Sequence, residues 1–234
     1  MNNGFYPALG TPTTPTGELI PESFNRQIEQ MIASGAQGVL CMGSMGKMAS
    51  IRVKENARIA RRCCDVVAKR VPVMVGVMDC SVSRVIDRIT SLGELDIDGV
   101  VATAPYYNAL SSNEVVHFFS TLAKKSRYPL CLYDLPGTMQ TSLTFSQLES
   151  LVRVSNIVGI KTGNLSLVLE LLHSNLLDNR HFSIFYSNLD SFGTAISLGI
   201  KKNLDGMFTC TPYNTQKMYK ENNDATTITH YLSN

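Results

Sequence analysis

The sequence has little charge of either sign. Only 17% of its 234 residues are Asp, Glu, Lys or Arg, and the formal net charge is +2. Proteins that bind nucleic acid or an anionic membrane surface usually carry a strong basic excess, so this composition argues against both partners. Neither a basic leader nor a long apolar stretch follows Met1. We therefore expect no membrane anchor, no secretion signal and a cytoplasmic location.

The chain also lacks the common motifs of metal and nucleotide sites. Its four histidines share no metal-ligand spacing, and the HExxH, Walker-type and GxGxxG patterns are absent. Its six cysteines form no CxxC pair, and several lie inside apolar runs. This usage is typical of buried, reduced thiols. The sequence therefore predicts no metal ion and no cofactor.

What the sequence does contain is a regular alternation of short apolar runs and amphipathic segments. Eight runs, spaced by roughly 23 to 33 residues as in βαβ units, are predicted as strands: 5–9, 38–42, 71–77, 99–102, 129–133, 157–161, 182–186 and 205–210. Helices are expected between them at 24–32, 51–69, 82–92, 114–125, 145–152, 165–176 and 191–198. The fold class is therefore α/β, and eight such units favour a (β/α)₈ TIM barrel over a doubly wound open sheet.

Lys161 is the most unusual residue for its position, because it closes a buried apolar strand. A buried amine favours its neutral form, which can attack a ketone and form a Schiff base. The alternative is an ordinary strand-end lysine whose head reaches solvent. In a TIM barrel the active site gathers at the C-terminal ends of the strands, so the neighbours of Lys161 at those ends decide between the two interpretations.

The other strand ends carry residues that fit one reaction. Tyr133 ends the fifth strand and is predicted to transfer protons as a general acid and base. Ser44 and Tyr107 extend a hydroxyl relay from it. Gly43 and Met45 flank Ser44 in a turn whose backbone N–H groups can bind a carboxylate. Each feature alone has a simpler explanation as a turn or packing residue. Their joint placement favours the catalytic one.

Taken in order, these motifs resemble the pyruvate-dependent class I aldolase family that contains dihydrodipicolinate synthase and N-acetylneuraminate lyase. The resemblance rests on residues 7–12, 43–46, 104–108, 132–136, 157–161 and 205–208. It implies that Lys161 forms the Schiff base with pyruvate, that Tyr133 is the general acid/base, and that Ser44 and Tyr107 form the relay. In relatives the tyrosine matching Tyr107 reaches in from a neighbouring subunit, which implies a homo-oligomer, a dimer or a tetramer.

Three positions depart from the family pattern. Met45 removes a hydroxyl from the turn, and Lys47 stands where a glutamate is usual. After the fifth strand, the synthase branch carries an arginine that binds the carboxylate of the second substrate, and here that place reads Gly137, Thr138 and Met139. Without that bidentate partner the resemblance points away from dihydrodipicolinate synthesis.

The second substrate's pocket is expected to include Thr162, Asn188, Asp190 and Phe208. The polar pair Asn188 and Asp190 suits a hydroxylated aldehyde. The prediction is thus an enzyme that joins pyruvate to an aldehyde or cleaves a 2-oxo sugar acid, in the manner of N-acetylneuraminate lyase. Dihydrodipicolinate synthase activity is one alternative, and a catalytically weak 2-oxo acid binding protein is another.

The domain boundary is predicted near residue 212. We expect a barrel domain at 1–211, while 212–234 contains one helical pattern and a polar end. Beside the family's pattern this tail is expected to be the remnant of a longer C-terminal helical segment, so an incomplete fragment of an active enzyme is a further interpretation.

Overall fold

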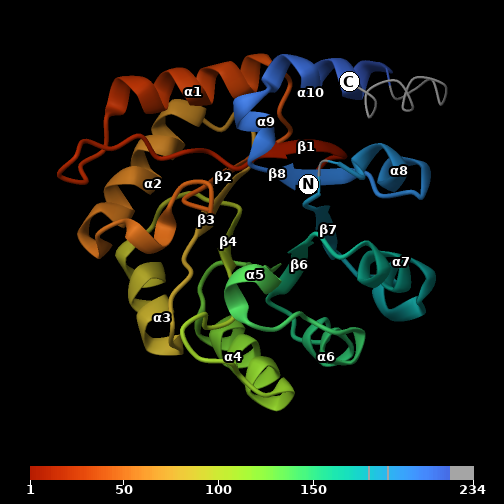
Figure 1. Cartoon of the computed structure of the whole chain (residues 1–234). Helices are drawn as coiled ribbons and strands as arrows, with labels where there is room; N and C mark the ends of the chain where they lie inside the picture. The colour runs from red at the N-terminus through yellow and green to blue at the C-terminus, as the bar shows by residue number, and fades with distance from the viewer. Residues whose placement is uncertain (179, 189, 222–234) are drawn as a thin grey trace.

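The computed structural model, which describes residues 1–178, 180–188 and 190–221, has a ring of eight parallel strands at its centre (Figure 1). Their order along the sheet is β1-β8-β7-β6-β5-β4-β3-β2. A bridge from Ala8 to Leu40 joins the two end strands, and the Leu9 amide donates to the Leu40 carbonyl at 2.9 Å. The predicted TIM barrel is confirmed. The strands are β1 (Gly4–Pro7), β2 (Val39–Cys41), β3 (Val73–Gly76), β4 (Gly99–Ala102), β5 (Leu130–Asp134), β6 (Ile157–Thr162), β7 (Ser183–Tyr186) and β8 (Lys202–Asp205).

Helices form the outer layer around this ring (Figure 1). The longer ones are α1 (Pro21–Ala33), α2 (Val53–Val67), α3 (Val82–Ser91), α4 (Ser112–Lys125), α6 (Phe145–Leu151), α7 (Leu165–His173), α8 (Phe192–Ser197) and α10 (Pro212–Glu221). Single turns occur at α5 (Pro136–Met139), α9 (Met207–Cys210), η1 (Met48–Ser50) and η2 (Asn175–Leu177).

Local sequence signals explain where several helices begin and end. α1 starts at Pro21, whose missing N–H would be unpaired in the first turn anyway, and Gly35 follows with the left-handed φ of +85° that ends it. In front of α4, Ser111 and Glu114 form a reciprocal capping box, which satisfies two N–H groups that the first turn leaves unpaired. These signals fix the helix ends that the periodicity alone leaves uncertain.

The strands bury both faces. Side chains on one face fill the lumen of the barrel, among them Tyr6, Leu40, Met74, Val101, Cys131, Tyr133, Phe185 and Leu204. The alternate positions, such as Val100, Leu130 and Ile160, pack outward into the larger core beneath the helices. Because side chains alternate along a strand, this register turns Lys161, the neighbour of Ile160, toward the lumen.

The eighth strand was predicted at 205–210, and this is wrong. β8 covers Lys202–Asp205, and Met207–Cys210 forms the helical turn α9. The apolar side chain of Phe208 packs edge-on against Phe5, with ring centroids 5.2 Å apart, and not within a strand. The true strand begins with the polar pair Lys202 and Asn203, so its sequence lacks an apolar run.

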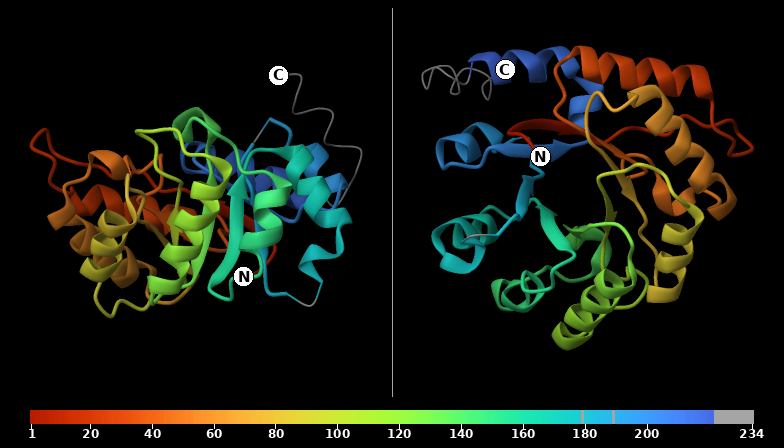
Figure 2. Two further views of the ribbon diagram at one scale, coloured as in Figure 1. Left: turned by 90° about the horizontal axis from the view of Figure 1, so that it is seen from below. Right: turned by 180° about the vertical axis from the view of Figure 1, so that it is seen from behind.

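The two ends of the barrel are distinct. In the side view of Figure 2, α5 lies at one end and the N-terminus at the other. The loops that follow the strands therefore gather at the α5 end. α10 lies outside the barrel near α1 in both end-on views (Figures 1 and 2). The remainder of the predicted tail, residues 222–234, lies outside the described residues.

Candidate active site

Lys161 and Tyr133 lie side by side inside the barrel. They are register partners on the adjacent strands β6 and β5, and both are nearly inaccessible to solvent. The Lys161 Nζ atom lies 3.7 Å from the centroid of the Tyr133 ring. The lysine therefore does not extend to bulk solvent, which removes the simpler strand-end explanation of its position.

Ser44 links the turn after β2 to this pair. Its Oγ lies 3.5 Å from the Tyr133 hydroxyl, at the outer limit of a hydrogen bond. The turn is tightly packed: a Cβ atom on Gly46 would lie 2.9 Å from the Cα of Met42 and 3.0 Å from the carbonyl oxygen of Leu9. Glycine is therefore required for the backbone to bring Ser44 over the barrel.

A cavity of about 450 Å³ opens beside Ser44, within the size range of small-molecule sites. Its polar lining comes from Ser44, Lys47, Ser50, Thr103, Tyr106 and Thr138, and its apolar lining includes Met48, Met78 and Leu135. Ser44 and Thr138 were predicted as site residues. Thr103 and Tyr106 were not, although Thr103 directly follows β4 and Tyr106 lies three residues further along the same loop.

Tyr107 and Met45 are not among the residues that line the cavity. Tyr107 is 80% exposed, whereas its neighbour Tyr106 lines the cavity. Met45 is partly exposed and packs on the loop after β8, where a Cβ on Gly206 would lie 3.2 Å from Met45 Cβ. Within one chain, the structure thus brings Ser44 and Tyr133 together without Tyr107.

Thr162 holds a buried carboxylate. Its hydroxyl donates to Asp134 Oδ2 at 2.7 Å, and the Leu143 amide donates to Asp134 Oδ1 at 2.9 Å. Burial raises the pKa of Asp134, although both hydrogen bonds act in the opposite direction. Since Asp134 follows Tyr133 and Thr162 follows Lys161, this bond locks the C-terminal ends of β5 and β6 together. Thr162 acts here as a positioning residue.

The remaining predicted pocket residues lie apart from this cavity. Asn188 is partly buried and close to Gly163: a Cβ atom added to Gly163 would lie 4.0 Å from Asn188 Cβ. Asp190 is exposed. Phe208 is fully buried against Phe5 and does not line the cavity. Substrate contact by these three residues stays a prediction.

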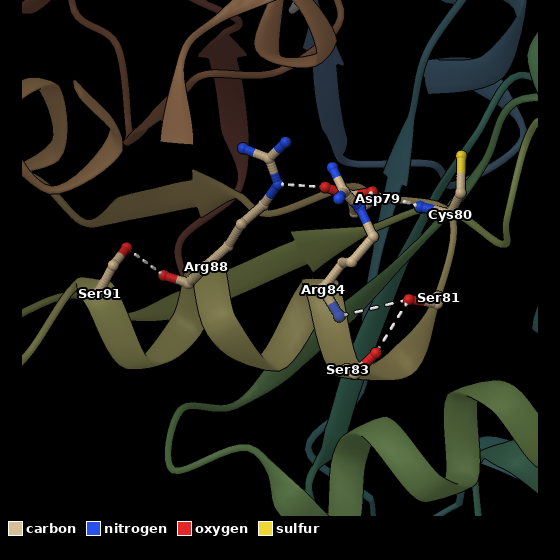
Figure 3. A network of polar contacts seen from close by, with 7 residues as sticks. All are labelled: Asp79, Cys80, Ser81, Ser83, Arg84, Arg88 and Ser91. Carbon is tan, nitrogen blue, oxygen red and sulfur yellow. Dashed lines mark hydrogen bonds and ion pairs between the residues drawn. The ribbon is translucent and has the colours of Figure 1, made fainter. Parts of the chain in front are cut away.

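A second buried carboxylate, Asp79, anchors the loop after β3 (Figure 3). It accepts hydrogen bonds from Arg84 Nε at 2.5 Å, the Cys80 amide at 2.7 Å and Arg88 Nε at 2.8 Å. Burial acts to raise the pKa of Asp79, but these donors outweigh it and the pKa is lowered. The adjacent cavity residue Tyr106 has a raised pKa, caused by burial and by its contact with Cys80. The network therefore fixes one wall of the cavity.

Within the described ranges, no three His, Cys, Asp or Glu side chains are grouped so that they could hold a metal ion. A search of the same part of the chain also finds no helix with the length and apolarity needed to span a membrane.

Comparison with known proteins yields consistent matches. The sequence model of the Dihydrodipicolinate synthetase family matches residues 1–232. The 4-hydroxy-tetrahydrodipicolinate synthase of Agrobacterium fabrum is 30% identical over 173 residues, which is 73% of this chain but only 59% of that protein. The chain thus matches less than two thirds of the length of this curated relative.

Solved structures show the same fold over nearly the whole chain. A prophage protein of the dihydrodipicolinic acid synthase family from E. coli K12, in complex with pyruvate, superposes with a TM-score of 0.89 at 25% identity, covering 98% of this chain and 79% of that one. The dihydrodipicolinate synthase of Aquifex aeolicus superposes with a TM-score of 0.86 at 21% identity, covering 99% and 80%.

Proposed function

We propose that this chain, which belongs to the dihydrodipicolinate synthetase family, is a Schiff-base aldolase that joins pyruvate to an aldehyde or cleaves the longer 2-oxo acid. One observation carries the proposal: a buried lysine amine lies against the ring of Tyr133, whose hydroxyl Ser44 approaches at the edge of a cavity. The E. coli relative in complex with pyruvate supports the choice of 2-oxo acid.

The proposed reaction uses these residues as follows. The Lys161 amine attacks the pyruvate ketone, and the carbinolamine loses water to give an iminium, with Tyr133 supplying the proton that leaves with the oxygen. Loss of a proton from the pyruvate methyl group gives an enamine. The enamine carbon bonds to the aldehyde carbon, and the aldehyde oxygen takes up a proton. Water then hydrolyses the iminium, which releases the product and restores the Lys161 amine.

The pyruvate carboxylate is assigned to the Gly43 turn. Its backbone N–H groups and the Ser44 hydroxyl offer donors close to Tyr133. Met45 contributes its amide there but no hydroxyl. This placement leaves the cavity beyond Ser44 for the aldehyde.

The relay is completed by a second copy of the chain in this proposal. An aromatic side chain that is 80% exposed in a single chain, as that of Tyr107 is, is suited to burial at an interface. We propose a homo-oligomer, a dimer or a tetramer, in which Tyr107 reaches the neighbouring site.

Dihydrodipicolinate synthesis is the second candidate, favoured by the name of the A. fabrum relative. Thr138 argues against it. Its side chain lines the cavity but carries no charge, so it cannot form the bidentate pair with a substrate carboxylate that an arginine would make.

Borohydride reduction in the presence of pyruvate tests the proposal. We expect a reduced pyruvyl adduct on Lys161, identified by peptide mass spectrometry, and none in the Lys161→Ala variant. Lys202→Ala removes a different strand lysine and serves as the matched control, which should still form the adduct. If folded wild-type protein, verified by circular dichroism, forms no adduct, the aldolase proposal is rejected.

A further inference from the structure

The cavity beside Ser44 has one charged residue in its lining, Lys47, which is itself exposed to solvent. Of the described residues that line it, Lys47 alone carries a charge, and the other polar groups are hydroxyls. None of the carboxylates in the described part of the chain lies within ion-pair distance of the Lys47 ammonium. The cavity therefore presents an unneutralised positive charge to whatever enters it.

The backbone holds Lys47 at a fixed place relative to the reacting groups. The Lys47 amide donates to the Ser44 carbonyl at 3.0 Å, and the Ser50 amide donates to the Lys47 carbonyl at 2.8 Å. Lys47 itself adopts a left-handed conformation, with φ 51° and ψ 38°, which is unfavourable for a residue with a side chain. These two backbone hydrogen bonds, one on each side of Lys47, hold its backbone in this conformation three residues after Ser44.

The rest of the cavity lining is neutral. It includes Thr138 on α5 and Leu135 just before it, and neither bears charge. Ser44 lies against Tyr133 and also lines the cavity. We therefore place the carbonyl end of an aldehyde that meets an enamine on Lys161 at Ser44, and its far end in the cavity. An anionic group at the far end gains a partner only on the Lys47 side.

We propose that Lys47 binds an anionic group at the end of the aldehyde substrate remote from its carbonyl. The substrate class is a short aldehyde that ends in a carboxylate or phosphate, with the hydroxyls of Thr103 and Thr138 available for polar groups along its chain. This inference rests on the proposed aldolase function and names the substrate class of the same site. It makes Lys47 a specificity-determining residue.

Paired aldehydes test the inference, with pyruvate as the donor. Succinic semialdehyde is compared with butanal, and D-glyceraldehyde 3-phosphate with D-glyceraldehyde. For each pair the ratio of kcat/KM, charged over neutral, is measured in wild type, Lys47→Gln, Lys47→Arg and Lys125→Gln. Lys125, an exposed lysine at the end of α4, provides the matched control.

We expect the ratio to exceed one in wild type for at least one pair and to fall about 10-fold or more in Lys47→Gln, mainly through KM. Lys47→Arg should restore most of it, and Lys125→Gln should retain it. The pair that responds identifies the anion as carboxylate or phosphate.

Pyruvate trapping on Lys161 in the same samples separates the two possible failures. If wild type forms the adduct but shows no preference for either charged aldehyde, or if Lys47→Gln weakens both members of a pair equally, the role of Lys47 is overturned while the aldolase stands. A slower trapping rate in Lys47→Gln assigns the lysine to pyruvate and also overturns it. If wild type forms no adduct, the aldolase proposal fails, and this inference fails with it.

Discussion

The β5–β6 side of the barrel and the β7–β8 side are built differently. β5 and β6 pair at five positions, from Leu130 with Ile157 to Asp134 with Thr162. β7 and β8 pair at one, Tyr186 with Asn203. The candidate catalytic pair lies on the first side, where backbone pairing and the Thr162 to Asp134 bond fix its geometry. The candidate catalytic pair thus lies where neighbouring strands pair over the most positions.

Two asparagines, Asn156 half-buried and Asn203 fully buried, show the same contrast. Asn156, just before β6, donates to the carbonyls of Ala123, Ser126 and Tyr128 at 2.9 to 3.1 Å. Asn203 on β8 is fully buried, yet neither side-chain atom has a hydrogen-bond partner among the residues that the structure describes. The Asn156 amide therefore stabilises the fold, whereas burial of the Asn203 amide lowers the free energy of unfolding.

The largest expected effect is on turnover, from a substitution on the β5–β6 side that keeps the packing. Tyr133→Phe keeps the ring beside Lys161 but removes the hydroxyl that transfers protons, so turnover should fall by roughly 10² to 10⁴-fold. Steady-state kinetics with pyruvate and an accepted aldehyde measure this. Tyr213→Phe, at an exposed tyrosine, is the control and should keep the wild-type rate. An unchanged rate in Tyr133→Phe would assign the proton transfer to another group.

The next effect compares the two sides directly. Asn203→Leu should raise the free energy of unfolding by about 1 to 3 kcal/mol, because it replaces a buried amide that has no partner among the described residues with an apolar side chain of similar size. Asn156→Leu should lower the same free energy by about 1 to 3 kcal/mol, because three carbonyls lose their donor. Urea titrations followed by circular dichroism provide both values. Equal losses in the two variants would contradict the contrast.

The smallest effect concerns pH. Burial raises the pKa of Asp134 above its ordinary value of 3.8, so the native state keeps this proton to higher pH than the unfolded chain. The contribution of Asp134 to stability is therefore complete below the unfolded pKa and is lost as pH rises through the folded pKa.

Asp134→Asn removes that titration. Wild type should lose stability relative to this variant as pH is raised from the unfolded value toward neutrality, as measured by urea unfolding at several pH values. The exposed Asp87→Asn variant should follow wild type throughout. A wild-type curve parallel to that of Asp134→Asn would show that Asp134 does not titrate in this window.

Sequence prediction was also more accurate on the β5–β6 side than on the β7–β8 side. The runs at 129–133 and 157–161 are strongly apolar, and β5 and β6 form there with Tyr133 and Lys161 aligned. β8 was misplaced because its true sequence is polar at Lys202 and Asn203, while the apolar Met207 and Phe208 next to it form a helical turn. Apolar runs indicate buried segments, but they do not distinguish a strand from a buried helical turn.

Within the site, the sequence singled out Lys161 and Tyr133 on strands and Ser44 in its turn, but it did not single out the cavity residues that follow β4. The alternation of side chains along a strand predicts the direction of Lys161 and Tyr133. It does not predict which of the adjacent residues Tyr106 and Tyr107 lines the cavity, because the loop after β4 has no regular period. The contribution of Thr103 likewise depends on where β4 ends.

The Asp79 network has a consequence for how the sequence can change over time. Arg88 is almost fully buried. Among the described residues, Asp79 is the only carboxylate that forms an ion pair with it. A mutation that removes Asp79 first leaves a buried guanidinium without a counterion, which is strongly destabilising. Loss of Arg88 first is milder, because Asp79 keeps Arg84 and the Cys80 amide. Descendants of this sequence should therefore lose the pair in one order, arginine before aspartate.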